Sequence, residues 1–269
     1  MGAGRGQETG SKIMKVVTVA QQKGGDGKST NIAHLTFDFL ERGLRVAVCE
    51  LDPQGNVAST LRQFDTVYTA SKMFESGGVD SLHAALAGLP DGALVRVIAA
   101  DNAMADVNMR KFDQVAGAFK QNVAALAAYF DVLLIDTAPS LNVSLASALN
   151  ASDCVLSPIQ MEAYSIQGIK KMLIVIGNIR KLNPKLKFLG MLPNMVDARD
   201  PRQVRNLAEL KAAYPQLMIP LEIGRRGSIA DAMATGVPVW KIKKTTARKA
   251  TQEVRAVAAY VFEKMEIEA

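Results

Sequence analysis

The residues best suited to chemistry lie in the segment QQKGGDGKST at 21–30. Backbone N–H groups of a glycine-rich turn can converge on phosphate oxygens, and a helix that starts behind the turn adds partial positive charge. The turn contains three glycines, Gly24, Gly25 and Gly27. Behind them, Lys28 would neutralise the β- and γ-phosphates, Ser29 would bind Mg²⁺ and Thr30 would bond the α-phosphate. The spacing therefore predicts a site for a nucleotide with magnesium.

Two aspartates follow apolar runs further along the chain. Asp52 comes directly after LRVAVCEL, and Asp136 ends the apolar run in DVLLIDTAPS. Open α/β sheets bind ligands at the carboxyl ends of their strands, so we expect both carboxylates to lie beside the glycine-rich turn. An aspartate behind four apolar residues also has the form of a Walker B strand, whose carboxylate holds Mg²⁺ through water. Taken alone, Asp136 would also fit a strand-ending residue that caps a turn.

The glycine-rich turn departs from the usual phosphate loop. The pattern G-x-x-x-x-G-K-S/T requires glycine at position 22, where this chain has Gln22. The chain instead has K-G-G-x-G-K-S, which contains a second lysine, Lys23. In this form the loop resembles that of the ParA/MinD family of ATPases. The resemblance implies that Lys23 of each subunit reaches the nucleotide of its partner, so that ATP is bound between two subunits of a homodimer.

The same resemblance assigns roles to the two aspartates. It implies that Asp52 orients or activates the attacking water and that Asp52, Ser29 and Asp136 surround Mg²⁺. The segment around Asp52 is similar to the family's D-x-D-P-Q-G-N, in which Gln54 and Asn56 belong to a first switch. Lys23, Lys28 and Asp52 would then be the catalytic residues. The first acidic position of that segment is Glu50 here, a longer carboxylate whose role is less defined.

Further stretches resemble the family as well. Thr137 to Ser140 correspond to the second switch, which reports the nucleotide state to partners, and residues 157–169 resemble the segment after the fifth strand. Asn194 in LPNMVDAR stands where the family commonly reads adenine. The resemblance therefore implies that Asn194 is an adenine-reading residue. The alternative interpretation is a turn former, because polar residues after a strand often have that role.

Asp26 is the residue of the loop that departs from the family, which usually has a small or apolar residue there. A carboxylate near a triphosphate repels it, unless the carboxylate points to solvent or pairs with a lysine. The backbone N–H of Asp26 remains available to a phosphate, so the residue stays among the expected nucleotide-binding positions. We expect weakened or retuned ATP binding and not its loss.

The elements that must position these residues alternate along the chain. Short apolar runs rich in β-branched residues stand at 15–21, 44–51, 94–100, 131–137, 153–159 and 187–193. Helical patterns stand at 28–42, 110–130, 142–150, 162–182, 201–214 and 245–265. This alternation predicts an α/β fold with a doubly wound, mostly parallel sheet flanked by helices, as in P-loop NTPases. Residues 65–93 are expected to be irregular. One helix face is predicted from Ile166, Ile169, Leu173 and Ile176.

The whole chain fits a single domain. Its 269 residues and 49% hydrophobic content allow a large core, and no linker or internal repeat is visible. Residues 1–14 are polar and glycine-rich and predict a flexible tail before an ATPase domain at 15–269. No run is apolar enough for a membrane span or a signal peptide, so we expect a cytoplasmic protein. The resemblance further implies that it associates with the nucleoid. Cys49 and Cys154 stand within apolar runs and are expected to be reduced core residues.

Basic residues cluster near the C-terminus, in a chain of net charge +6. The cluster consists of Lys241, Lys243, Lys244, Arg248, Lys249 and Arg255. On a helix, Lys244, Arg248 and Arg255 would fall within about 40° of one another, opposite an apolar stripe. Such a ridge, extended by Arg225 and Arg226, would bind the phosphates of double-stranded DNA without reading bases. A solvated charged face is the alternative interpretation.

The resemblance implies a DNA-segregation ATPase of the plasmid-partition type. Such a protein dimerises with ATP, binds DNA without sequence preference and is released when a centromere-bound ParB-type partner stimulates hydrolysis to ADP. Three alternatives stay open: a MinD-like positioning ATPase, a nucleotide-sensing scaffold with little hydrolysis, and a metabolic enzyme of the same superfamily. A MinD-like membrane helix is disfavoured, because the terminal MEIEA is acidic and anionic lipid would repel it.

Overall fold

Six strands form one sheet in the computed structural model, which describes residues 13–90, 92–161 and 166–267. The side chains of residues 166–168 also lie outside the description. The strands are β1 (Lys15–Val19), β2 (Arg45–Glu50), β3 (Leu94–Ile98), β4 (Val132–Asp136), β5 (Cys154–Gln160) and β6 (Lys187–Asn194). Their order is β3-β2-β4-β1-β5-β6, and all neighbours pair in parallel. The predicted parallel sheet and its six strand positions are confirmed.

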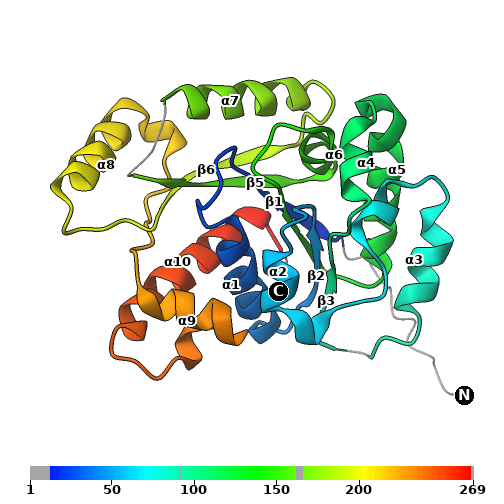
Figure 1. Ribbon diagram of the computed structural model, residues 1–269, viewed down its shortest axis with the longest axis horizontal. Coiled ribbons are helices and arrows are strands. Elements are labelled where there is room, and N and C mark those ends of the chain that lie inside the picture. Colours follow the sequence, from blue (N-terminus) through cyan, green and yellow to red (C-terminus); the bar gives the residue numbers. More distant parts are fainter. Residues whose placement is uncertain (1–12, 91, 162–165, 268–269) are drawn as a thin grey trace, which may run out of the picture.

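Helices cover both faces of this sheet (Figure 1). They are α1 (Lys28–Glu41), α2 (Asn56–Thr60), α3 (Gly78–Leu86), α4 (Met104–Met109), α5 (Phe112–Ala125), α6 (Val143–Ala151), α7 (Ile166–Arg180), α8 (Pro201–Ala213), α9 (Gly227–Thr235) and α10 (Ala247–Met265). Helices α1, α9 and α10 lie on one face, whereas α3 to α6 lie on the other. The predicted doubly wound architecture is therefore confirmed.

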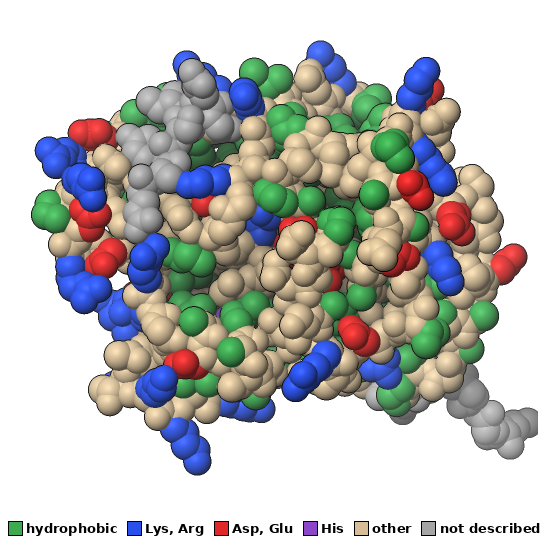
Figure 2. All heavy atoms as spheres, in the orientation of Figure 1, with side chains coloured by type: hydrophobic (Ala, Val, Ile, Leu, Met, Phe, Trp, Pro, Cys, Tyr) green, Lys and Arg blue, Asp and Glu red, His purple; other side chains and the backbone are tan. Residues whose placement is uncertain are grey.

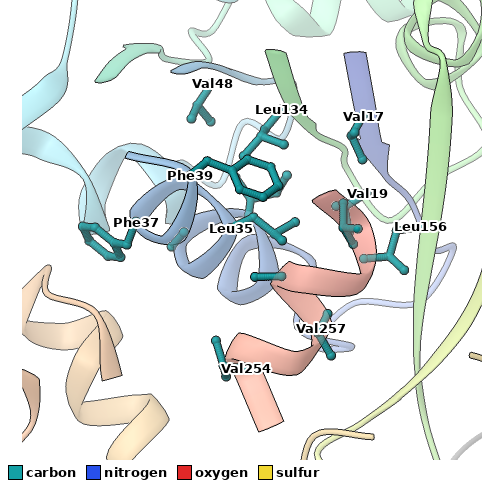
Figure 3. Packing of buried hydrophobic residues seen from close by; sticks show 14 of the residues in the cluster. Val17, Val19, Leu35, Phe37, Phe39, Val48, Leu134, Leu156, Val254 and Val257 are labelled. Atoms are coloured by element: carbon teal, nitrogen blue, oxygen red, sulfur yellow. The ribbon is translucent and has the colours of Figure 1, made fainter. Parts of the chain in front are cut away.

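The alternation of side chains along β1 explains why the sheet needs two covers. Val17 and Val19 are fully buried on the face of α1 and α10, whereas Val16 is buried on the opposite face. Figure 3 shows Val17 and Val19 beside Leu35 of α1 and Val257 of α10. Burying both faces is what gives the strands their continuous apolar runs. The phosphate-loop helix α1 is thus packed between the sheet and the C-terminal helix.

The prediction for residues 65–93 was wrong in part. That segment contains a 3-10 helix at Ala70–Phe74 and then α3, and its side chains enter the second core. Phe74, Leu82 and Leu86 are almost fully buried there, and Phe74 stacks on Phe119 of α5 with ring centroids 4.5 Å apart. These buried side chains hold the segment although its overall polarity is mixed, and they follow no single period that would reveal them in the sequence. The short helices α2 and α4 were also not predicted.

The ends of two predicted segments lie outside the described residues. Of the expected tail at 1–14, residues 1–12 are outside the description, whereas Met14 is 6% exposed and packs in the core. Helix α7 begins at Ile166, and residues 162–165 of the predicted 162–182 helix are outside the description. Ile169 and Ile176 of the predicted apolar face are buried, with Leu173 partly buried beside them. The side chain of Ile166 is not among those described.

Two expectations drawn from composition can be compared with the structure. No helix within the described ranges combines the length and the apolar character that crossing a bilayer requires. Cys49 and Cys154 are both buried and unbonded, as expected for reduced core residues. Burial also raises the pKa of both thiols, that of Cys154 to about 11. Neither thiol is therefore a ready thiolate ligand.

Candidate nucleotide-binding site

The predicted phosphate loop connects β1 to α1 at the centre of the sheet. Gly25 and Gly27 have φ angles of 84° and 83°, in the left-handed region that glycine adopts without strain. Lys28 is the first residue of α1 and is buried, and its Nζ lies 3.3 Å from the carbonyl oxygen of Lys23. The Lys23 side chain itself is exposed. The loop thus has the strand, turn and helix context that phosphate binding requires.

A cavity of about 460 Å³ opens on the loop. Its wall combines residues of the loop, the segment after β2, and single residues from three later segments. The lining residues are Gly24, Gly25, Gly27, Lys28, Ser29, Thr30, Asp52, Gln54, Asn56, Ser59, Thr60, Pro139, Met195 and Met233. Most of the predicted loop residues and Asp52 therefore share one cavity at the carboxyl edge of the sheet, where such sheets bind ligands.

Ser29 and Asp136 form a pair behind this cavity. The Ser29 hydroxyl donates to Oδ2 of Asp136 at 2.7 Å, and Oδ1 of Asp136 is buried without a hydrogen-bond partner. Burial raises the pKa of Asp136 to about 7, an effect that the Ser29 hydrogen bond opposes and that Glu50 and Asp52 reinforce. A hydroxyl beside an unpartnered buried carboxylate oxygen is a donor set that suits Mg²⁺. The residues present therefore fit a nucleotide-bound magnesium ion.

Asp52 and Glu50 shape the segment after β2. Asp52 is buried at 7% exposure, and its Oδ1 accepts the backbone N–H of Gln54 at 3.0 Å. Glu50 is fully buried and accepts the N–H groups of Val57 and Ala58 at 2.7 and 3.2 Å, in the first turn of α2. The longer carboxylate at position 50 thus caps a helix of the predicted first switch. Its pKa is raised to about 7, chiefly by burial.

Asp26 has neither of the two environments expected from sequence. Its side chain is only 3% exposed, and Oδ1 is buried without a hydrogen-bond partner. Burial raises the pKa of Asp26 to about 6, although Lys23 and Lys28 act in the opposite direction. The carboxyl group therefore neither points to solvent nor forms a hydrogen-bonded pair through this oxygen. Its charge is poorly compensated at the place where a triphosphate would add more negative charge.

Asn194 contacts the phosphate loop itself. It is the last residue of β6, is 2% exposed, and its Nδ2 donates to the carbonyl oxygen of Asp26 at 2.7 Å. A Cβ atom on Gly27 would come within 2.1 Å of this nitrogen, so the contact adds a second reason for glycine at position 27. The amide nitrogen thus has a partner other than a base, and adenine reading by Asn194 stays a prediction.

The predicted basic ridge is not formed, which corrects the helical-wheel argument. Helix α10 begins at Ala247, so Lys244 precedes it and pairs with Asp231 at 2.5 Å. Arg255 faces α1, where it pairs with Asp38 and Glu41, and its guanidinium lies 3.6 Å above the Trp240 ring. The wheel placed these residues together because it ignores where a helix begins and what its polar face contacts.

The prediction that Arg226 extends the basic ridge is also wrong, because Arg226 pairs with Glu253 of α10 at 2.5 Å and is largely covered. The remaining basic residues are exposed, namely Lys241, Lys243, Arg248, Lys249 and Arg225. Within the described part of the chain, no acidic side chain forms an ion pair with the first four of these. Figure 2 shows Lys and Arg side chains along the edge of the molecule formed by α8, α9 and α10. A smaller basic surface than predicted therefore remains.

Comparison with known proteins places this site in a family. The family model described as "AAA domain" matches residues 14–188. Protein IncC from Escherichia coli is 56% identical over 267 residues, which cover 99% of this chain and 74% of the relative. The chromosome partitioning protein ParA from Myxococcus xanthus is 27% identical over 239 residues, which cover 88% of this chain and 84% of the relative.

A solved structure is similar along most of its length. Cobyrinic acid a,c-diamide synthase from Mycobacterium smegmatis, with bound ATP analog and magnesium, superposes with a TM-score of 0.73 at 25% identity. The match covers 94% of this chain and 96% of that one. The matched family model includes the phosphate loop, Asp52 and Asp136, and the identity to IncC extends over the remainder. The chain therefore belongs to the ParA family of AAA-domain ATPases and is a homologue of IncC.

Proposed function

We propose that this protein is a plasmid-partition ATPase that binds Mg-ATP, dimerises around it and holds DNA in that state. The observation that carries the proposal is that the loop residues Gly24 to Thr30, except Asp26, line one cavity together with Asp52, and that Asp136 is hydrogen-bonded to Ser29 of that cavity. The 56% identity to IncC over nearly the whole chain supports the partition role. The proposed ligands are ATP and ADP with Mg²⁺.

Each residue of the cavity has a role that follows from its chemistry. Lys28 neutralises the β- and γ-phosphates, while backbone N–H groups of the loop and Thr30 bind phosphate oxygens. Ser29 and Asp136 hold the magnesium ion, which supplies charge neutralisation to the phosphates. Asp52, which also lines the cavity, orients the water that attacks the γ-phosphate. Transfer to water then depends on positioning and electrostatic stabilisation. Slow intrinsic turnover is expected, because Lys23 must come from the second subunit.

Dimerisation is proposed from Lys23. This side chain is exposed next to the cavity and belongs to the same loop as the buried Lys28. An exposed lysine beside a triphosphate site can neutralise phosphates of a second subunit that closes over it. We therefore infer a homodimer that needs ATP, with Thr137 to Ser140 as the second switch that reports the nucleotide state to partners.

Non-specific DNA binding is proposed from Lys241, Lys243, Arg248 and Lys249, with Arg225 nearby in the α9 entry. Lysine and arginine side chains on a surface bind phosphates without base contacts, and a dimer doubles the number of contacts. A ParB-type protein bound at the centromere would stimulate hydrolysis and release the DNA. This partner and the nucleoid location follow from the family and not from any particular contact in the fold.

A metabolic synthase is the second candidate, because the structurally similar cobyrinic acid a,c-diamide synthase has an ATP-analog site on the same fold. Such an enzyme needs a second substrate site and has no need of DNA. An iron-protein-like function is disfavoured, because Cys49 and Cys154 are buried with raised thiol pKa values. The DNA measurement described next separates these candidates.

The decisive experiment measures DNA binding with ATP, ADP and no nucleotide at several salt concentrations. The proposal predicts binding of a duplex of any sequence only with ATP, and a steep loss of affinity as salt rises. Two matched variants are compared. Lys28→Ala should bind DNA under no condition, whereas Asp52→Ala should bind DNA with ATP and fail to hydrolyse the ATP. Equal binding in all three nucleotide states, or none in any, would contradict the proposal. Light scattering on the Asp52→Ala variant with ATP tests the dimer.

A further inference from the structure

Three side-chain amides reach the phosphate loop from three different elements. Nε2 of Gln160, at the end of β5, lies 2.6 Å from the carbonyl oxygen of Gly25. Nδ2 of Asn194, at the end of β6, lies 2.7 Å from that of Asp26, and Nδ2 of Asn31, in α1, lies 2.8 Å from that of Gly27. The amides therefore contact three consecutive backbone carbonyls. Since a carbonyl oxygen only accepts hydrogen bonds, each amide must present its NH₂ group to the loop.

These contacts set the direction of the loop's N–H groups. In a planar trans peptide, the C=O of one residue and the N–H of the next point in opposite directions. Holding the carbonyls of residues 25, 26 and 27 toward the amides therefore directs the N–H groups of Asp26, Gly27 and Lys28 away from them. Those three N–H groups belong to the turn that binds phosphate in such loops. Successive N–H groups that converge on one side are what an anion-binding loop needs.

The loop needs this support because of its composition. Gly25 and Gly27 lack a Cβ atom and have positive φ angles, so their peptide planes turn over at little steric cost. A loop that samples several orientations pays an entropic cost when a ligand orders it, and a loop held in the binding orientation avoids that cost. Asn194 and Asn31 are 2% and 4% exposed, so water does not replace their amides easily.

We propose that Gln160, Asn194 and Asn31 form an amide clamp that orients the phosphate-loop N–H groups for the triphosphate. The clamp residues are positioning residues, since they contact the loop and not the reacting atoms. The inference rests on the proposed nucleotide site and adds to it a cause for its preorganisation. It also gives Asn194 a role that does not depend on adenine.

The test compares variants that keep side-chain size and remove the donor, namely Gln160→Met, Asn194→Leu and Asn31→Leu. Affinity for ATP is measured with magnesium by calorimetry, together with the thermal midpoint of the nucleotide-free protein. Loss of one orienting hydrogen bond should weaken ATP binding about fivefold, and the triple variant about a hundredfold. Asn206→Leu is the matched control, because it removes an equivalent amide bond to the carbonyl of Met161 at 3.0 Å, just beyond β5. The control should lose stability without losing ATP affinity.

A second comparison separates orientation from general stability. Gln160 is partly exposed, so its variants should fold even if those at Asn194 or Asn31 do not. A Gln160→Leu variant also lacks the donor and adds no charge, so it should lose about as much ATP affinity as Gln160→Met. The clamp would be overturned if Gln160→Met bound ATP as tightly as the unmodified chain. It would also be overturned if Asn206→Leu lost as much ATP affinity as Gln160→Met. An unmodified chain that binds no ATP would overturn the proposed function as well, whereas loss of DNA binding alone would leave the clamp intact.

Discussion

Replacing Asp26 by asparagine should strengthen ATP binding. The substitution keeps the size of the side chain and the backbone N–H and removes the negative charge. If a phosphate charge is taken to lie about 8 Å from the carboxylate, Coulomb's law at an effective dielectric of about 20 gives about 2 kcal/mol of repulsion. Screening by Lys23 and Lys28 reduces this value, since both lysines act on the Asp26 carboxyl. We expect ATP affinity at pH 7.5 to rise about tenfold, measured by calorimetry with magnesium.

The same substitution predicts a change in pH dependence. The pKa of Asp26 is raised from 3.8 to about 6, so the folded state holds its proton more tightly than the unfolded chain. The stabilisation that this tighter proton binding gives to the folded state is complete below about pH 4 and is lost as pH rises through about 6. At about 1.4 kcal/mol per pH unit the full effect is at most about 3 kcal/mol, and relaxation of a glycine-rich loop lowers it to about 1–2 kcal/mol. The Asp26→Asn variant should therefore melt several degrees higher at pH 7.5, with a smaller gap at pH 5.

Comparing the ATP affinities of the unmodified chain and the Asp26→Asn variant separates the effect of the Asp26 carboxyl group from other effects of pH. ATP itself titrates near neutral pH, but that effect is common to both, so the ratio of their affinities reports Asp26 alone. This ratio should grow from pH 5.5 to pH 8. Asp113→Asn, which changes an exposed carboxylate on α5, is the control and should leave both affinity and melting unchanged. A flat ratio with equal affinities at pH 7.5 would refute the argument, because the charge of Asp26 would then not act on the nucleotide.

Three further predictions follow from other contacts. Arg255→Ala should lower the unfolding free energy by about 2 kcal/mol in thermal melts, because the buried Asp38 loses one of its two arginine partners, and should leave the salt dependence of DNA binding unchanged. Replacing Arg248 and Lys249 by alanine removes four charges from the dimer and should lower the slope of log affinity for DNA against log salt by about 4, without affecting melting. Glu50→Ala should lower hydrolysis more than ATP affinity in steady-state assays, because it frees the first turn of α2.

Sequence reasoning succeeded where a local rule governs the outcome. Strand β4 is a run of apolar residues because a parallel strand is buried on both faces, and this made Val132 to Ile135 recognisable. The phosphate loop is determined by its own glycines and by its place between a strand and a helix. The shared location of Asp52 and Asp136 could be predicted because both stand at strand ends, which a parallel sheet brings to one edge.

Sequence reasoning failed where the outcome depends on a distant segment. Arg255 has the spacing of a surface residue, yet Asp38 and Glu41 lie more than two hundred residues earlier and meet it only in the fold. Asn194 and Gln160 likewise contact the loop only because β5 and β6 follow β1 in the sheet. Periodicity describes one element at a time, so it could assign these side chains to a surface or a strand end but not to their partners.

The position of the first strand and the last helix has a consequence for synthesis of the protein. Strand β1 pairs with β4 and β5, and α1 packs against α10, so β1 and α1 obtain these neighbours only after much later segments have been synthesised. The support of the phosphate loop is therefore incomplete until α10 has left the ribosomal exit tunnel. A chain truncated within α10 would therefore leave α1 without one of the elements that hold it against the sheet, and should bind nucleotide poorly.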